Sequence, residues 1–446
     1  MKQLLNASRA LCTAITLALS ATAAGAELDY GLLAGASYSD NVLRASSNEQ
    51  SSAAAVVGFD LRGSRTTGRL LYDVFADVEY RDYTEDGVDS QEYGRLIALG
   101  SYAIVPERFE WLLSGSFDQM RESLLRPAAI GNLENVTTLS TGPRFTVTMD
   151  TFEVQTEAHY TLASYSERNF DSATAGGVLT LGRRVSERSY IGAGASYDDV
   201  TYDVPRGAIA PDYERSEYFV RLRTEGARTE FEADAGYTQI SGDGFEDDGP
   251  MARARLTRRL TPFVSGFLGY TQVFSTSADA TFTPTPSDGA LFGDASTLSG
   301  GPREYSSSEV GLVMSRTRTT ATLTYARRAE STVGPREDDR NYDELSASLT
   351  RLITTRSSFG VYGTYTDEQL EGVLVDPFGP PIDADASELM FGTNLQLALG
   401  RALSLEVRAE YRDRDSDVVG GSYKELSGGI FLRYGSARRQ ASQAAL

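Results

Sequence analysis

The chain is poor in the residues from which metal sites and reactive centres are usually built. It has 446 residues with one cysteine, one histidine and one tryptophan. Structural zinc sites take four Cys or His ligands, and a disulfide needs two thiols, so neither is expected. No glycine-rich phosphate loop or other cofactor motif is present. We therefore expect no cofactor, no metal and no catalytic residue.

Long apolar runs and an excess of positive charge are missing as well. A membrane-spanning helix needs about 20 consecutive apolar residues, and no segment after the N-terminal one approaches that length. The chain has 42 Lys and Arg against 62 Asp and Glu, a formal net charge of -20. Because a phosphate backbone is bound by a basic surface, we expect no nucleic-acid partner.

The N-terminal segment has the organisation of a secretory signal. Lys2 and Arg9 precede an apolar run over residues 10–24, and Ala24, Gly25 and Ala26 form a small-residue cleavage site. We predict that residues 1–26 are a signal peptide cleaved near Ala26. The residues before Cys12 do not form a lipoprotein cleavage box, so no lipid anchor is expected. The mature protein would then contain no cysteine.

Most of the remaining chain alternates apolar and polar residues with a period of two. Residues 72–81 show the pattern: Tyr72, Val74, Ala76, Val78 and Tyr80 share one face, and Asp73, Asp77, Glu79 and Arg81 share the other. One face suits lipid and the other suits water. Because backbone groups in hydrocarbon must be satisfied within the protein, such a sheet must close into a barrel around a lumen.

The links between these stretches alternate between very short and long. Nine short links are expected at or around residues 64–67, 105–108, 150, 184–188, 225–228, 258–261, 316–319, 354–356 and 400–401. Ten long ones are expected at 42–50, 83–90, 122–135, 165–171, 203–213, 241–249, 275–303, 331–340, 369–385 and 415–421. This predicts an all-β fold, a transmembrane antiparallel up-and-down β-barrel of about 20 strands over residues 27–434, with 18 strands as the next choice. Residues 435–446 would form a polar C-terminal tail.

A barrel of this size has a wide lumen, and the chain has no room for a plug domain before its first strand. Any obstruction would come from a loop. The candidate is the loop over residues 275–303, which is rich in Ser, Thr, Gly and Pro. It either folds into the lumen or is a mobile surface loop.

Three short motifs resemble one family of outer-membrane proteins. They are the opening Tyr38, Ser39, Asp40, Asn41 and Val42, the stretch over residues 135–143, and the turn over residues 259–262. They resemble the β-barrel porins associated with exopolysaccharide and PEP-CTERM systems. The resemblance implies an outer-membrane location and a link to polysaccharide traffic with periplasmic export partners. It carries over no catalytic residue.

Charged residues on the predicted inner face form a mixed ladder. Following the strand parity, the candidate lumen-lining residues are Arg221, Arg223, Glu232, Asp234, Arg253, Arg255, Glu406, Arg408, Glu410 and Arg412. Their arginines could form a track for an anionic sugar, using planar donor forks. Alternatively, cross-strand ion pairs simply satisfy a polar wall.

His159 shares the predicted inner face with Glu153, Gln155 and Glu157. It is the one residue on which a barrel hydrolase could be built, but no nucleophile motif accompanies it, and a wall residue is the alternative. Acidic clusters over residues 243–249 and 337–339 lack the spacing of a calcium loop. They are expected to be hydrated loops, with bridging of lipopolysaccharide cations as the other interpretation.

Together these patterns predict an outer-membrane barrel that acts as a conduit for exopolysaccharide or another surface polymer. The alternatives are a barrel that anchors an envelope assembly without transport, a general diffusion porin, and a barrel hydrolase. A soluble β-solenoid or propeller should repeat a sequence unit, and no fixed period is present. The expected partners are outer-membrane lipid and lipopolysaccharide, a polysaccharide and periplasmic export proteins. The sequence does not determine the oligomeric state.

Overall fold

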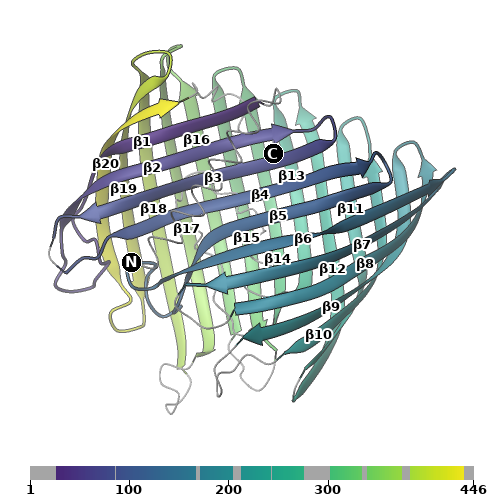
Figure 1. Cartoon of the computed structure of the whole chain (residues 1–446). Helices are drawn as coiled ribbons and strands as arrows, with labels where there is room; N and C mark the ends of the chain where they lie inside the picture. The colour runs from purple at the N-terminus through teal and green to yellow at the C-terminus, as the bar shows by residue number, and fades with distance from the viewer. Residues whose placement is uncertain are drawn as a thin grey trace.

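The computed structural model covers the whole chain and describes residues 27–85, 87–166, 171–203, 212–242, 244–275, 302–333, 339–373 and 382–435. The predicted signal peptide, the tail from residue 436 onward and most of the 275–303 loop lie outside the described residues. The described residues form 20 β-strands joined in one sheet (Figure 1). Every pairing in this sheet is antiparallel, as an up-and-down barrel requires.

The strands are 12 to 17 residues long. In chain order they are β1 Glu27–Ser39, β2 Ser52–Arg65, β3 Leu70–Tyr83, β4 Gln91–Val105, β5 Phe109–Arg121, β6 Leu133–Met149, β7 Phe152–Tyr165, β8 Asp171–Ser186, β9 Ser189–Asp203, β10 Tyr213–Glu225, β11 Thr229–Gly242, β12 Phe245–Thr261, β13 Val264–Ser275, β14 Arg303–Arg316, β15 Thr319–Thr332, β16 Asp339–Leu352, β17 Ser357–Val373, β18 Ile382–Ala398, β19 Leu403–Ser416 and β20 Tyr423–Gly435.

The sheet closes because its first and last strands pair with each other. β1 pairs with β20 from Gly31 opposite Gly435 to Ser39 opposite Ser427. Closure gives every strand two neighbours, so the sheet has no edge strand. The prediction of a closed antiparallel barrel with 20 strands is therefore confirmed. Among the described residues, no helix is long and apolar enough to cross a membrane.

The predicted alternation of short and long links is also found. At one end of the barrel, nine links of two to four residues join β2 to β3, β4 to β5 and so on to β18 and β19. β1 begins and β20 ends at this same end. At the other end the links are mostly longer, among them residues 40–51 and 122–132. In bacterial outer-membrane barrels the long links face the outside of the cell, and we call the end with long links the mouth.

One predicted long link is wrong. The sequence predicts an acidic loop over residues 241–249, but β11 and β12 continue to Gly242 and Phe245, which pair with each other. The acidic residues Asp247 and Asp248 are exposed strand residues of β12. A strand that projects into water can carry carboxylates on both faces, so polarity alone did not mark a loop here. The 369–385 link is likewise shorter than expected, since β17 and β18 extend into it.

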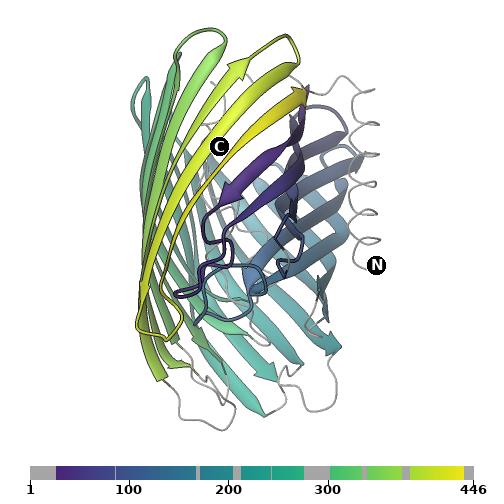
Figure 2. The same ribbon diagram turned by 90° about the vertical axis from the view of Figure 1, so that its left-hand side faces the viewer.

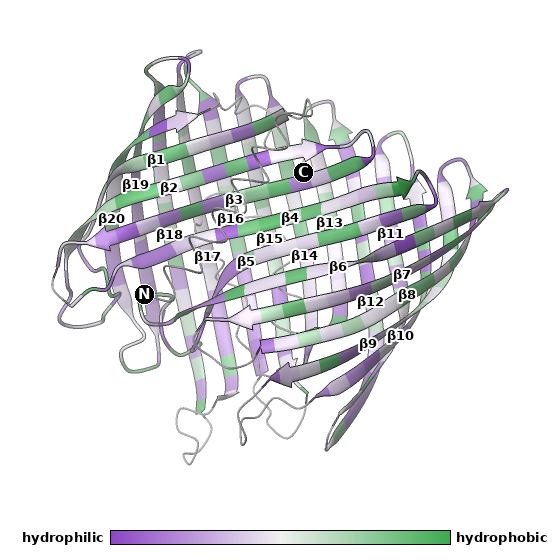
Figure 3. Cartoon of the chain, viewed as in Figure 1, coloured by the Kyte–Doolittle hydropathy of each residue, from purple (hydrophilic) through white to green (hydrophobic). Residues whose placement is uncertain are grey.

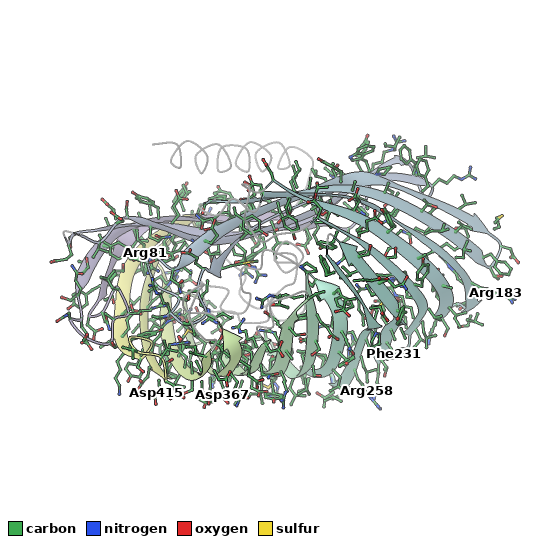
Figure 4. All side chains as sticks on the ribbon, turned by 90° about the horizontal axis from the view of Figure 1, so that it is seen from below. Arg81, Arg183, Phe231, Arg258, Asp367 and Asp415 are labelled. Atoms are coloured by element: carbon green, nitrogen blue, oxygen red, sulfur yellow. The ribbon has the colours of Figure 1, made fainter. Side chains whose placement is uncertain are left out.

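The two faces of the barrel differ in polarity. Large apolar side chains with exposed fractions of about one half, such as Val57, Leu181 and Ile430, point outward from strands all round the barrel. Hydrophobic and hydrophilic residues alternate along the strands in Figure 3. Such a continuous apolar outer surface exceeds what a water-soluble monomer exposes. Seen along its length, the wall has an elongated rather than round outline (Figure 4).

Candidate conduit and its mouth

The candidate lumen-lining residues lie on the strand faces opposite to the outward apolar residues. On β10, Tyr218, Val220 and Leu222 are exposed on the outside, so Arg221 and Arg223 point inward. The same alternation holds on β11, β12 and β19. The ten residues nevertheless fall into two groups with different surroundings.

On β10 to β12 the charged ladder has the register that the sequence suggested. Arg221 lies opposite Asp234, and Asp234 lies opposite Arg253. Arg221 donates two hydrogen bonds to Asp234, both 2.8 Å long. Arg253 lies 3.4 Å from Glu217. These contacts favour the interpretation as wall ion pairs over a free anion track.

The part of the ladder nearer the short links is accessible to water. Arg255 is 2.9 Å from Glu309 on β14, yet 60% of its side chain is exposed. Arg223 is 3.0 Å from Glu225 and 49% exposed. Glu232 is exposed and lies in register between Arg223 and Arg255. Solvent therefore reaches the inner wall of β10 to β12 near their short links.

On β19 the charged residues pack against one another and against β3, and water has less access to them. Arg408 lies 2.6 Å from Glu406 and 2.7 Å from Glu79 on β3. Arg412 lies 2.7 Å from Glu410, and only 2% of its side chain is exposed. These four residues of β19 are less accessible to water than Arg223 and Arg255. The reason is the approach of β3 to β19, which the sequence alternation could not show.

The packing of this side continues to the end of the barrel where β1 begins and β20 ends. Arg433 on β20 bonds Asp60 on β2 through two hydrogen bonds, and both side chains are nearly buried. The pair passes over β1 at Gly31, where any side chain would overlap both partners. Leu33, Val56 and Phe431 form a buried apolar cluster next to it. We call the inner face of β1 to β3 and β18 to β20 the packed side.

At the mouth, the loop over residues 40–51 is fixed by the motif that begins at Tyr38. Asn41 is fully buried, and its side-chain amide donates to the carbonyls of Ala45 and Lys424, both at 2.9 Å. Ser39 donates a 2.7 Å hydrogen bond to Glu425, and Asp40 accepts one of 2.7 Å from the Leu426 amide. The motif therefore ties this loop to the start of β20.

The loop over residues 40–51 turns into the barrel at Arg44. Its guanidinium is 2.8 Å from Glu425, and it donates a hydrogen bond to the carbonyl of Ala128 in the loop over residues 122–132. Burial by itself lowers the pKa of Arg44, but Tyr423 and the Glu425 carboxylate raise the pKa above its ordinary value. Arg44 is therefore a cation at physiological pH, and it joins two mouth loops.

The second mouth loop begins where β5 leaves the wall. β5 pairs with β4 only as far as Phe117 opposite Leu96. Beyond that point the Gln119 side chain lies between the two strands. It donates a 2.7 Å hydrogen bond to the Glu92 carbonyl and accepts a 3.3 Å hydrogen bond from the Gly94 amide. The end of β5, including Arg121, is thereby released from β4 and turns into the barrel.

The loop over residues 122–132 docks on the opposite wall. Asn132 organises it by donating to the carbonyls of Ser123 and Pro127, both at 2.9 Å. Leu124 and Leu125 pack in a buried cluster with Leu370 of β17 and Ala384 of β18, with Ile382 and Val418 beside them. Figure 2 shows these N-terminal loops within the outline of the barrel, beside the last strands.

A buried carboxylate holds the end of β5 against β17. Glu368 accepts two hydrogen bonds from Arg121, 3.2 and 2.9 Å long. Arg340 of β16 lies 2.7 Å away and Arg414 of β19 lies 3.6 Å away. All four side chains are 5% exposed or less. This is a structural cluster, because its charges face one another and not the solvent.

His159 is part of the inner wall. It lies 2.9 Å from Asp198 on β9, and Asp198 in turn lies 2.8 Å from Arg215 on β10. The His159–Asp198 pair passes over β8 at Gly176, where a Cβ atom would meet both side chains. Within the described residues no serine, threonine or cysteine is bonded to His159, so this geometry supports the wall interpretation.

Sequence reasoning missed the residues that shape the mouth. Arg44, Arg121 and Glu368 are widely separated along the chain, and only the closed barrel brings their surroundings together. A usable signal was the pair of leucines, Leu124 and Leu125, inside an otherwise polar link. In the part of the chain that the structure describes, no group of acidic, His or Cys residues could hold a metal ion.

Comparison with known proteins gives structural neighbours only. No family model matches the chain, and no curated protein matches it. The structure is similar to the siderophore receptor PirA from Pseudomonas aeruginosa, with 12% identity, coverage of 92% of this chain and 80% of that chain, and a TM-score of 0.42. It is also similar to the FrpB iron transporter from Neisseria meningitidis, with 8% identity, coverage of 91% and 82%, and a TM-score of 0.45.

A third similar structure is the siderophore receptor PiuA from Acinetobacter baumannii, with 9% identity, coverage of 91% and 81%, and a TM-score of 0.45. At such low identity no residue role can be transferred. The function of this chain is therefore argued from its own residues.

Proposed function

We propose that this protein is an outer-membrane conduit for a hydrophilic solute. The observation that carries the proposal is the water-accessible charge inside a closed barrel that is apolar outside: Arg255 and Arg253 point inward and are 60% and 42% exposed. A barrel filled for structural reasons alone would bury these guanidinium groups or lack them. Their exposure requires water next to the inner wall.

The outer membrane is the location that the two faces fit. An apolar outer surface of strands, with every strand paired, satisfies the backbone within hydrocarbon. Bacterial barrels of this design, with an even number of strands and short links at one end, are found in the outer membrane. The predicted signal peptide over residues 1–26 would direct the chain across the inner membrane.

We propose a surface polymer such as an exopolysaccharide as the solute. The resemblance of the motif at Tyr38 to exopolysaccharide-associated barrels supports this choice. The inner face also supports it, because the charged ladder is largely neutralised by its own ion pairs. The remaining inward groups on β14 to β17 include hydroxyl side chains suited to sugar hydroxyl groups: Ser307, Ser348 and Thr364.

A general diffusion porin is one alternative. The two loops that are folded inward and fixed by buried contacts would restrict free diffusion through the mouth. The other alternative is a barrel that anchors an envelope assembly and conducts nothing. It predicts a closed channel in a lipid bilayer.

Two measurements test the proposal. The purified full chain in a planar bilayer should give discrete conductance steps, and a deletion strain should retain its surface polymer inside the envelope. Export should return with the wild-type gene. A barrel that inserts without conductance, in a strain that exports normally, would support the anchoring role instead. Conductance with normal export would support a general porin.

A further inference from the structure

We infer that the outer face of the barrel binds the headgroups of anionic phospholipids at the end with short links. The binding surface is a set of outward arginines that we call the arginine belt: Arg183, Arg258, Arg316 and Arg351. This inference rests on the proposed membrane location and not on conduction, and it names the class of lipid that the surface selects.

The belt arginines are exposed, and they end the outward apolar rows of their strands. On β8, for example, Leu179 and Leu181 are exposed outward, and Arg183 is the next outward residue. Each belt arginine lies at most three residues from the last residue of β8, β12, β14 or β16. Figure 4 shows Arg183 and Arg258 on the outer side of the wall. Arg65 of β2 also points outward at this end, but it donates to the backbone of its own turn.

In the described part of the chain, the belt arginines have no carboxylate partner. The outward strand positions next to the short links hold no Asp or Glu, and none of the four guanidinium groups forms an ion pair with a described carboxylate. Inward arginines at the same end are paired: Arg184 lies 3.2 Å from Glu153, and Arg255 lies 2.9 Å from Glu309. Positive charge is therefore matched inside the barrel and unmatched outside it.

Aromatic rings position two of the belt arginines. The Arg183 guanidinium lies 5.3 Å from the centroid of the Phe152 ring, and the Arg316 guanidinium lies 5.2 Å from that of Phe263. Both rings are themselves about half exposed. A guanidinium that stacks on a ring keeps the N–H groups along its edge free, and this planar fork matches the oxygens of a phosphate group. The rings thus hold the cations where the apolar surface meets water.

The mouth end of the outer apolar surface carries the opposite charge. Outward positions toward the mouth hold Asp248 on β12, Glu304 on β14 and Asp343 on β16. On these three strands the carboxylate and the belt arginine are 8 to 12 residues apart. A tilted strand crosses the hydrocarbon of a bilayer in about 9–11 residues. The arginine belt therefore lies at the headgroup level of one leaflet.

The class of ligand follows from the position and charge of the belt. The arginines point away from the barrel next to lipid-facing side chains, so a lipid headgroup reaches them directly. An anionic headgroup brings an unneutralised phosphate, whereas a zwitterionic headgroup brings its own ammonium group. Short links face the periplasm in bacterial barrels, and lipopolysaccharide belongs to the opposite leaflet. The partner that fits is therefore an anionic glycerophospholipid of the periplasmic leaflet.

Lipid binding by the folded full chain tests the inference. The barrel in detergent is titrated separately with phosphatidylglycerol, phosphatidylethanolamine and lipopolysaccharide, and bound lipid is measured by native mass spectrometry. The belt variant carries four substitutions: Arg183→Gln, Arg258→Gln, Arg316→Gln and Arg351→Gln. The matched control removes the same charge from exposed arginines of the inner face: Arg184→Gln, Arg223→Gln, Arg253→Gln and Arg255→Gln.

We expect wild type and the inner-face control to bind phosphatidylglycerol at least about fivefold more tightly than phosphatidylethanolamine, since one arginine near an anionic lipid surface contributes about that factor. The belt variant should bind the two lipids equally. Replacing the four belt arginines by lysine should keep the preference, which separates loss of charge from loss of folding. Arg316→Gln alone should reduce the preference, and it provides the measurement if the fourfold variant does not fold.

A folded belt variant that keeps the wild-type preference would overturn the inference. So would an equal loss in the inner-face control, or a belt that selects lipopolysaccharide over phosphatidylglycerol. The measurement does not require conduction. A barrel that conducts nothing but selects phosphatidylglycerol through the belt would refute the conduit alone, and a conducting barrel without this preference would refute the lipid site alone.

Discussion

Arg121 and Glu368 bond across the barrel at 2.9 and 3.2 Å, although β5 and β17 are eight strands apart in the sheet. The pair brings two remote parts of the wall together at the mouth of the barrel. The inner faces of β1 to β3 and β18 to β20 carry packed arginine–glutamate pairs and an apolar cluster. Near the short links of β10 to β12, the ion pairs of the inner wall are exposed to water.

The first prediction concerns the buried carboxylate. Glu368→Gln removes the one negative charge shared by Arg121, Arg340 and Arg414, so these buried cations lose a common partner. We expect the free energy of unfolding to fall by about 3–5 kcal/mol. Urea unfolding of the refolded barrel measures it. Glu232→Gln, at an exposed inner-wall carboxylate, should change it by less than about 0.5 kcal/mol.

The second prediction concerns the apolar contacts that hold the loop over residues 122–132 against the wall. Replacing both Leu124 and Leu125 by Asn puts polar groups into the cluster with Leu370 and Ala384, so the loop should leave the wall. We expect faster proteolysis of this loop and a larger single-channel conductance. Val419→Asn, at a fully exposed residue of a neighbouring link, is the control and should change neither. A protease-sensitive loop with unaltered conductance would mean that the loop does not restrict the lumen.

The third prediction concerns the crossing at Gly31. Gly31→Ala places a methyl group where the Arg433–Asp60 pair passes over β1. We expect a loss of about 1–3 kcal/mol in stability from overpacking, seen as a lower temperature for conversion of the heat-modifiable band on gels. Gly100→Ala is the matched control, because its nearest neighbours would be 3.6 Å from the new methyl. Equal effects of the two substitutions would contradict a clamp at the β1–β20 seam.

The fourth prediction concerns ion selectivity. Arg255→Gln leaves Glu309 without its arginine on the inner wall, so the lumen should gain preference for cations. The reversal potential in a salt gradient should shift accordingly, while wild type shows at most weak selectivity. Arg183→Gln removes the same charge from β8 at a position stacked on Phe152 outside the lumen, and should leave the reversal potential unaltered. A strongly anion-selective wild-type pore would instead support the interpretation of the inner-wall arginines as a track for an anionic sugar.

The fifth prediction concerns the only histidine. His159→Gln should preserve conduction and export, because Asp198 keeps its contact with Arg215. The loss in stability should be about 1 kcal/mol, the usual size of one hydrogen bond. Loss of a hydrolytic activity on lipid or peptide in this variant, with the barrel still folded, would show that His159 has a chemical role.

Some features of the fold need no tertiary information, and here they follow from local periodicity. The alternation from Tyr72 to Arg81 assigns each side chain to a face, and a two-residue period can be satisfied in hydrocarbon only by a closed sheet. Link lengths then indicated the strand number and the end at which β1 begins and β20 ends. The residues of the inner-wall ladder followed from the same parity, including Arg221 opposite Asp234.

Only the tertiary structure decided which parts of the inner face meet. Arg44, Arg121 and Glu368 lie in separate hairpins, and their proximity depends on the elongated outline of the barrel and the departure of β5 from β4. The same is true of Arg408 and Glu79. Alternation specifies the direction of a side chain relative to its own strand, whereas the distance between opposite walls depends on the packing of all 20 strands and on the loops between them.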